Sequence, residues 1–129
     1  MTSQSIETEN LIEEINETIE KCINCGMCKG RCPVFHALKE EVNSPRGRVN
    51  ILNEKIFDNI LYNCSLCKSC EINCPLELEL PSAFRKARQV IVDRKKEPKG
   101  NREMLENVKK YGNPFGKIEK GKIKKLYCC

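Results

Sequence analysis

The sequence predicts a mostly α-helical fold, and three observations support this prediction. Apolar residues recur at intervals of three and four residues in several stretches, which is the spacing of one face of an α-helix. Residue types that begin and end helices flank these stretches, for example Ser44 followed by Pro45. Two cysteine-rich segments of equal spacing alternate with the helical stretches, so the helices are expected to surround them.

The first two expected helices lead into the two cysteine segments. One covers residues 7–21. The other begins at Pro45, with Ser44 as its N-cap, and ends near Asn63. The insert between the motifs is expected to hold a helix of about 16 residues, or about 24 Å. Each carries one apolar stripe that is expected to pack in a core. The stripes consist of Leu11, Ile12, Ile15 and Ile19 in the first helix and Val49, Leu52, Ile56 and Ile60 in the second.

Two more helices are expected after the second cysteine segment. One opens at Pro81 and runs to about Lys95, with basic residues in its last turn. A linker over residues 95–101 leads to a shorter helix over residues 102–111, for which Gly112 is the C-terminal cap. The residues expected in the core are Phe84, Ala87 and Ile91 from the first of these helices and Met104, Leu105 and Val108 from the second.

The composition allows one domain of ordinary size with a thin core. The chain has 129 residues, of which 5% are aromatic and 32% are charged, and it has no Trp. Since side-chain burial alone would stabilise such a chain weakly, its ten cysteines are expected to organise the interior. We divide the chain into an N-terminal helix (1–21), a cysteine-bearing domain (22–96) and a C-terminal helix and tail (97–129).

An internal repeat relates the two cysteine segments. The residues Cys22, Cys25, Cys28, Cys32 and Pro33 recur as Cys64, Cys67, Cys70, Cys74 and Pro75. A constant offset of 42 residues over five positions predicts two equivalent sites within one small domain.

The spacing within each segment is typical of 4Fe-4S clusters. A C-x2-C-x2-C loop delivers three thiolates, and in two-cluster ferredoxins the next cysteine, which is followed by Pro, ligates the other cluster. We therefore expect two 4Fe-4S clusters that exchange their fourth ligands. The ligands expected are Cys22, Cys25, Cys28 and Cys74 for one cluster and Cys64, Cys67, Cys70 and Cys32 for the other.

Neighbouring residues have expected roles around the clusters. Gly26 and Gly30 would let backbone amides approach the sulfurs closely, and Pro33 and Pro75 would each begin a short helix that leads away from a cluster. Apolar side chains would exclude water from the clusters. These are Ile23, Met27, Val34, Leu66, Ile72 and Leu76.

Disulfides and zinc are the alternatives to clusters. Disulfides are typical of secreted proteins and have no reason to repeat with this spacing. Structural zinc sites draw cysteines in pairs from two knuckles, whereas here four cysteines crowd twice into eleven residues. The spacing therefore favours iron–sulfur clusters over both alternatives.

Charge and hydropathy limit the compartment and the partners. The polar N-terminus shows no secretion signal, and the longest aliphatic run, residues 90–92, is too short for a membrane span, so we expect a cytoplasmic protein without direct membrane insertion. The formal net charge of +5 counts the cysteines as neutral, and thiolates bound to metal would bring it close to zero. We therefore do not expect nucleic-acid binding.

With its two motifs and the intervening Ser-Pro-Arg-Gly-Arg stretch (44–48), the sequence resembles the C-subunit family of heterodisulfide reductase over residues 22–116. It is also similar to the iron–sulfur subunits of glycolate oxidase and anaerobic glycerol-3-phosphate dehydrogenase. The resemblance implies an alpha-helical ferredoxin with two 4Fe-4S cluster loops and a short basic C-terminal tail. It further implies electron transfer between a flavin-containing oxidoreductase subunit and a second redox subunit.

The C-terminus departs from this family. Larger relatives continue into domains with a Cys-Cys-Gly context, whereas this chain stops at Cys128 and Cys129. The alternative to a relay subunit is therefore the N-terminal portion of a split or truncated reductase whose Cys-Cys-type catalytic domain lies elsewhere. A third hypothesis is a zinc-binding interaction module that uses its basic tail on nucleic acid.

Several other residues receive structural interpretations. His36 is expected to be structural because eight cysteines already saturate two clusters. Arg46 and Arg48 are expected to brace the fold internally, and Phe35 and Tyr62 to shield the clusters. No phosphate loop, nucleophile–base pair or carboxylate pair is found, so no autonomous catalytic site is expected.

Overall fold

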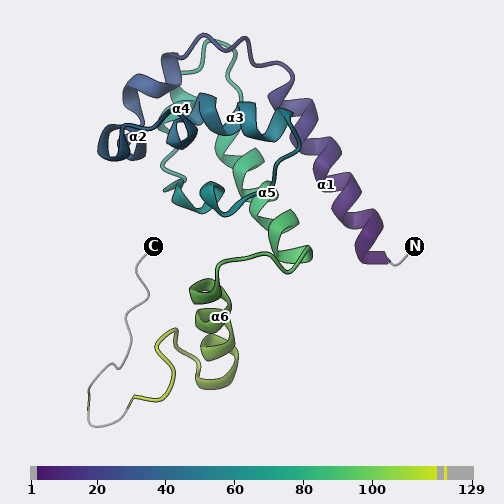
Figure 1. Cartoon of the computed structure of the whole chain (residues 1–129), viewed down its shortest axis with the longest axis vertical. Coiled ribbons are helices and arrows are strands. Elements are labelled where there is room, and N and C mark those ends of the chain that lie inside the picture. Colours follow the sequence, from purple (N-terminus) through teal and green to yellow (C-terminus); the bar gives the residue numbers. More distant parts are fainter. Residues whose placement is uncertain (1–2, 119–120, 122–129) are drawn as a thin grey trace. The chain divides into compact units, whose positions relative to one another are not determined.

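The structure, a computed structural model, describes residues 3–118 and 121. It forms two compact units, Met1–Lys96 and Glu97–Cys129. Within the described residues all regular structure is helical and no strand occurs, so the predicted mostly α-helical fold is confirmed (Figure 1). None of the helices in this part of the chain is both long and apolar enough to cross a bilayer.

The cysteine segments lie between short helices of the first unit. That unit contains α1 (Ser3–Ile19), the 3-10 helix η1 (Met27–Arg31), α2 (Pro33–Leu38), η2 (Glu41–Asn43), α3 (Pro45–Asn53), η3 (Asn59–Asn63), α4 (Ser69–Ile72) and α5 (Leu80–Asp93). The second unit contains α6 (Lys99–Tyr111). We call residues 22–28, which run from the end of α1 into η1, the first loop. Residues 64–70, which run from η3 into α4, are the second loop.

Helices α1 and α5 form the scaffold of the first unit and lie side by side (Figure 1). Thr8, near the start of α1, donates a hydrogen bond of 3.1 Å from its hydroxyl to the carboxylate of Asp93, at the end of α5. Further along, Lys86 Nζ lies 2.7 Å from Glu14 Oε2. The two helices are therefore antiparallel.

The hydrophobic core lies between these helices, α3 and η3, as the apolar stripes predict. Its fully buried members include Ile15, Ile19, Val49, Leu52, Leu61, Phe84, Ala87, Val90 and Ile91. Leu11 and Ile12 pack against it while partly buried. The core holds α1, α3 and α5 together, so the loops between them have fixed ends.

The inter-motif helix is shorter than predicted. α3 ends at Asn53 rather than near Asn63, because Lys55 adopts a left-handed conformation with φ of 56°. The Lys55 N–H then donates to Leu52 O at 2.8 Å and the Ile56 N–H to Ile51 O at 3.1 Å, which is the Schellman pattern of a helix end. Ile56 is consequently 52% exposed instead of lying in the core.

The later helices agree with the sequence in position but not fully in packing. α5 ends at Asp93, so the expected basic residues follow its last turn instead of lying in it. α6 begins at Lys99, three residues early, and Gly112 caps it with φ of 71° as predicted. The expected burial of its apolar stripe is wrong, since Leu105 and Val108 are each 44% exposed.

Candidate metal centre

The two cysteine loops have left-handed residues at equivalent positions. Asn24 and Leu66, which are equivalent in the repeat, have φ of 56° and 54°, and the equivalent Gly26 and Lys68 have φ of 79° and 65°. A left-handed conformation is rare for a bulky residue such as leucine and persists only where the surrounding structure requires it. Left-handed residues in such turns form concave nests of N–H groups that bind anions, iron–sulfur clusters among them.

The second loop surrounds a pocket. Cys64, Cys67 and Cys70 line it together with Cys32 from the end of the first motif. The pocket is partly open to solvent. The structure thus brings together the four cysteines that the sequence assigns to one cluster, from segments that are far apart in the chain.

Hydrogen bonds and burial set the chemistry of the thiols in this pocket. Burial, followed by the charge of neighbouring thiolates, raises the pKa of Cys70 to about 12. The Ser69 hydroxyl, which lies 3.5 Å from the sulfur, lowers the pKa of Cys67. The Leu66 N–H donates to Cys64 Sγ at 3.4 Å. Hydrogen bonds to sulfur of this kind tune the reduction potential of a cluster.

The first loop gathers three of its predicted ligands. Burial and then the charge of Cys22 raise the pKa of Cys28, and Cys25 raises it further, so the three thiols are near one another. The backbone N–H of Arg46 bonds to Cys28 and acts in the opposite direction. Cys74 is partly buried against the hydrophobic core, and its assignment to this loop stays a prediction.

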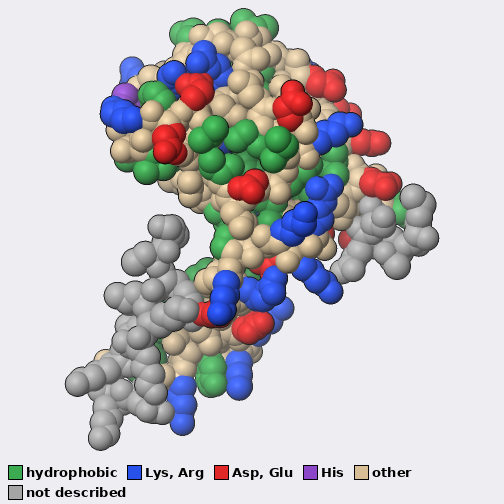
Figure 2. Space-filling model, in the orientation of Figure 1, with side chains coloured by type: hydrophobic (Ala, Val, Ile, Leu, Met, Phe, Trp, Pro, Cys, Tyr) green, Lys and Arg blue, Asp and Glu red, His purple; other side chains and the backbone are tan. Residues whose placement is uncertain are grey.

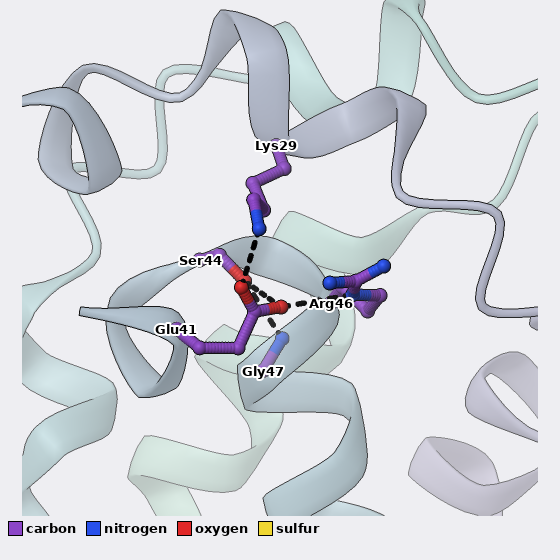
Figure 3. A network of polar contacts seen from close by, with 5 residues as sticks. All are labelled: Lys29, Glu41, Ser44, Arg46 and Gly47. Atoms are coloured by element: carbon purple, nitrogen blue, oxygen red, sulfur yellow. Dashed lines mark hydrogen bonds and ion pairs between the residues drawn. The ribbon is translucent and has the colours of Figure 1, made fainter. Parts of the chain in front are cut away.

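A network of polar contacts holds the first loop against the start of α3 (Figure 3). Glu41 is at its centre and accepts hydrogen bonds from Lys29 Nζ at 2.6 Å and from Arg46 Nε at 2.8 Å. These two cations, in that order, are the largest causes that lower the pKa of Glu41 to about 2. Because Lys29 lies in η1 and Arg46 in α3, the carboxylate joins the two segments.

The N-terminus of α3 is close-packed against the same carboxylate. Ser44 is the N-cap and accepts the Gly47 N–H at 2.9 Å, as predicted. A Cβ atom on Gly47 would lie 1.9 Å from the backbone oxygen of Glu41, so only glycine fits there. A Cβ atom on Gly26 would lie 2.8 Å from Arg46 Nη1, which places the guanidinium against the first loop.

Arg88 anchors the second loop, and no feature of the sequence predicted this role. Its side chain reaches from α5 and donates from Nε to Leu61 O at 3.1 Å and from Nη2 to Cys64 O. Its guanidinium also lies over the ring of Tyr62, 5.2 Å from the centroid. No local pattern could have predicted these contacts, because they join residues 24 to 27 positions apart.

Arg48 provides a test of whether the pocket of the second loop fits a cluster. Arg48 lines this pocket and is 0% exposed. Within the described residues its Nε and Nη2 atoms have no hydrogen-bond partner. A buried cation without a partner is strongly unfavourable, so the pocket has the electrostatics of an anion site. A cluster held by four thiolates is such an anion, and the residues present fit it.

Four of the expected water-excluding side chains do not have that role. Ile23, Met27, Ile72 and Leu76 are exposed, and only Val34 and Leu66 line the pocket of the second loop. Ile23 and Met27 each adjoin a left-handed residue of the first loop, Asn24 and Gly26, where the backbone turns. Ile72 and Leu76 lie beyond the second loop. The prediction that six side chains shield the clusters is therefore wrong for these four.

Two further expectations about the loops need correction. Gly30 has no atom within 4 Å of the position of a Cβ, so no close approach requires glycine there. Pro33 begins α2 as predicted, whereas Pro75 lies in a turn and the next helix starts only at Leu80. The turn follows because Glu77 is left-handed, with φ of 52°.

The residues with structural interpretations make internal contacts. His36 Nε2 lies 2.8 Å from the carbonyl oxygen of Gly30, within hydrogen-bond distance. Phe35 lies under Lys29 Nζ at 4.7 Å, and Tyr62 packs against the core. Arg46 is bonded to Glu41, and Arg48 is buried at the pocket of the second loop, as described above. Cys128 and Cys129 lie outside the described residues.

Charged side chains are mixed on the surface of the first unit. On its face drawn in Figure 2, basic and acidic side chains are interspersed and do not gather into one basic patch.

Among residues 3–118 and 121, no three Cys, His, Asp or Glu side chains converge closely enough to hold a single metal ion.

The fold and the two loops together are those of a domain that binds two 4Fe-4S clusters. Residues 18–78, which include both motifs, match the family model of the 4Fe-4S dicluster domain. This match confirms the predicted cofactors, and it covers the part of the chain that carries all eight motif cysteines.

Curated relatives include named subunits of oxidoreductases. The chain is 25% identical to the glycolate oxidase iron-sulfur subunit of Escherichia coli over 74% of its own length and 26% of that protein. It is 30% identical to the C subunit of the H(2):CoB-CoM heterodisulfide,ferredoxin reductase of Methanothermobacter thermautotrophicus over 56% of its length and 40% of that protein. It is 27% identical to the probable glycolate oxidase iron-sulfur subunit of Bacillus subtilis over 81% of its length and 27% of that protein. The chain therefore spans between about a quarter and two fifths of the length of these relatives.

Proposed function

We propose that this chain relays electrons through its two clusters as a subunit of a flavin-linked oxidoreductase of the heterodisulfide reductase or glycolate/glycerol-3-phosphate dehydrogenase type. The observation that carries the proposal is the pair of loops with left-handed residues at equivalent positions, which lie next to each other through the contact between η1 and α4. Each 4Fe-4S cluster supplies one-electron chemistry when bound.

The proposed ligand sets exchange one cysteine between the motifs. The lining of the pocket by Cys32 beside the second loop supports this exchange for one cluster. For the other cluster, the short distance between the loops and the constant repeat support it. The sets are Cys64, Cys67, Cys70 and Cys32 for the second loop and Cys22, Cys25, Cys28 and Cys74 for the first.

Each loop also has one exposed ligand, Cys25 in the first and Cys67 in the second. The redox group of a partner can approach most closely at these positions. We propose a flavin-containing subunit on one side of the relay and a second redox subunit on the other, in a reducing compartment such as the cytoplasm, where thiols stay reduced. The names of the relatives, which are subunits of larger enzymes, support this assembly.

The experiment that tests the proposal is purification of the tagged chain under anaerobic conditions from native cells. We expect a flavoprotein to co-purify, and the substrate of that flavoprotein should bleach the visible absorbance of the clusters. A chain with both Cys22 and Cys25 changed to Ser is the matched control and should show less bleaching. Clusters that no co-purifying flavoprotein reduces would contradict the proposal.

A further inference from the structure

We propose that Arg48 is the buried counter-charge of the cluster on the second loop and makes that cluster the first to be reduced. The proposal rests on the ligand set proposed above. Its starting point is the position of the guanidinium, which is 0% exposed and yet lines the pocket formed by Cys32 and the second loop.

The contacts of Arg48 within the described residues do not balance its charge. Its Nε and Nη2 atoms have no hydrogen-bond partner there. The ring of Phe84 lies 6.0 Å from Cζ, at the outer limit of a cation–π interaction. A guanidinium always carries its charge and offers several N–H donors, so it is suited to an anion in the same pocket. Thiolate sulfur and the sulfides of a cluster can accept these hydrogen bonds.

A fixed positive charge next to a cluster favours the reduced form. One-electron reduction adds one negative charge, and Coulomb attraction in a buried, weakly polarisable site is much stronger than in water. With both clusters bound, one electron would pass from the first-loop cluster to the second-loop cluster. The first-loop cluster would be oxidised and the second-loop cluster reduced, without any other reactant. Arg48 should therefore hold the electron on the second-loop cluster.

The arginine beside the first loop does not cancel this difference. Arg46 lies against Gly26, but its side chain is 30% exposed and its Nε is bonded to the carboxylate of Glu41 at 2.8 Å. Solvent and the neighbouring anion both weaken the field of Arg46 at the first loop. Arg48 has neither form of compensation among the described residues.

Hydroxyl groups act in the same direction as Arg48. Ser69 and Ser65 line the same pocket, and the Ser69 hydroxyl lies 3.5 Å from Cys67 Sγ, within hydrogen-bond distance. The equivalent positions of the first loop, 42 residues earlier, are occupied by Met27 and Ile23, which have no donor and are exposed. Hydrogen bonds to cluster sulfur stabilise the more negative, reduced form.

The test measures both midpoint potentials of the anaerobically purified holoprotein by redox titration with electron paramagnetic resonance. Arg48→Gln should lower the higher midpoint potential. The equilibrium constant for the electron between the two clusters should change by at least about tenfold, which corresponds to a shift of 59 mV for one electron. The lower midpoint should not change. Arg46→Gln should leave the higher midpoint in place. Arg94→Gln, which removes an exposed arginine lying over Phe57, should leave both in place.

The outcomes separate this inference from the proposed function. If Arg48→Gln contains both clusters but neither midpoint moves, or only the lower one moves, the inference is wrong and the proposed function stands. If Arg48→Gln does not load both clusters, Arg48→Lys decides. If Arg48→Lys contains both clusters and keeps the higher midpoint of the wild type, the charge at this position has the proposed role. If Arg48→Lys does not bind both clusters, the inference is wrong. A wild-type protein without two clusters would contradict the proposed function as well.

Discussion

Cys28 and Cys70, the third cysteines of the two loops, are electrostatic neighbours across the contact between η1 and α4. Burial, then the charge of Cys64, then that of Cys28 raise the pKa of Cys70 to about 12. Cluster assembly must therefore release a proton from Cys70 at neutral pH, since metal binds the thiolate. The same proximity makes the two cluster sites neighbours, which a relay of electrons requires.

The first prediction concerns metal content. Protein purified without oxygen should be brown and should contain about eight irons and eight sulfides per chain, because two cubes of four irons are held by eight cysteines. Iron and acid-labile sulfide assays measure this. About four irons in fully occupied, folded protein would mean that one loop is empty.

The second prediction is that folding depends on the clusters. Leu66 and Lys68 hold left-handed conformations that each cost about 1–3 kcal/mol in a non-glycine residue. Without bound metal, the loops lose the contacts that offset this cost. Removal of iron with a chelator should abolish the cooperative melt followed by circular dichroism. An unchanged helical signal and melt after chelation would show that the core alone suffices.

The third prediction concerns the exchange of ligands between motifs. In a background with Cys22→Ser and Cys25→Ser, only the second-loop cluster can assemble. Adding Cys32→Ser should abolish that cluster or convert it to a three-iron form, because Cys32 lines the same pocket. Electron paramagnetic resonance detects either outcome.

The matched variant in this background is Cys74→Ser, which should cause no further loss of the second-loop cluster. Ligation within each motif predicts the reverse result for the two variants. Iron content gives an independent measure, with about four irons expected in the background and in the Cys74→Ser variant.

The fourth prediction concerns Gly47. Gly47→Ala would place a Cβ atom 1.9 Å from the backbone oxygen of Glu41, and neither backbone segment can move aside as a flexible side chain could. Overpacking of this kind lowers the free energy of unfolding by about 1–3 kcal/mol. Denaturant unfolding measures the loss. Gly30→Ala is the control, because no atom lies within 4 Å of its Cβ position and it should be nearly neutral.

The fifth prediction concerns the pH dependence of the Glu41 network. Lys29 and then Arg46 lower the pKa of Glu41 from 4.5 to about 2. A carboxyl with a lowered pKa stabilises the folded state above its unfolded pKa, and this stabilisation is lost as the pH falls through the folded pKa. Glu41→Gln should therefore lower the denaturant concentration at half unfolding, relative to wild type, by the same small amount at every pH between about 8 and about 5.

Below pH 4.5, the difference between wild type and Glu41→Gln should shrink, because protonation of Glu41 gives wild type the same defect. Glu20→Gln, at an exposed acid beyond α1, is the control and should show no such pattern. A difference that grows as the pH falls would contradict this assignment.

The elements that could be predicted are those with local chemical signals. Ser44, Pro45 and Gly112 begin or end helices for reasons contained in their own side chains, and the structure places them there. The cysteine spacing likewise predicts cluster binding without knowledge of the fold. The end of α3 could not be predicted, because Lys55 takes a left-handed conformation that usually belongs to glycine.

The contacts of Arg88 and Arg48 were also beyond local patterns. Both depend on which distant segments meet, Arg88 at the carbonyl of Cys64 and Arg48 in the pocket with Cys32. The sequence predicted an internal role for Arg48 but not its position in this pocket, and it predicted no role for Arg88. Only the tertiary arrangement shows that Arg48 lines the pocket and that Arg88 holds the second loop.

The antiparallel pairing of α1 and α5 has a consequence for gene fusion. Thr8 and Asp93 are joined by a hydrogen bond of 3.1 Å, so the chain enters and leaves the first unit at nearly the same place. A unit with adjacent ends can be inserted into a longer polypeptide without straining either connection. The unit is therefore suited to fusion, as one portable cluster-binding segment, with neighbouring domains of different chemistry.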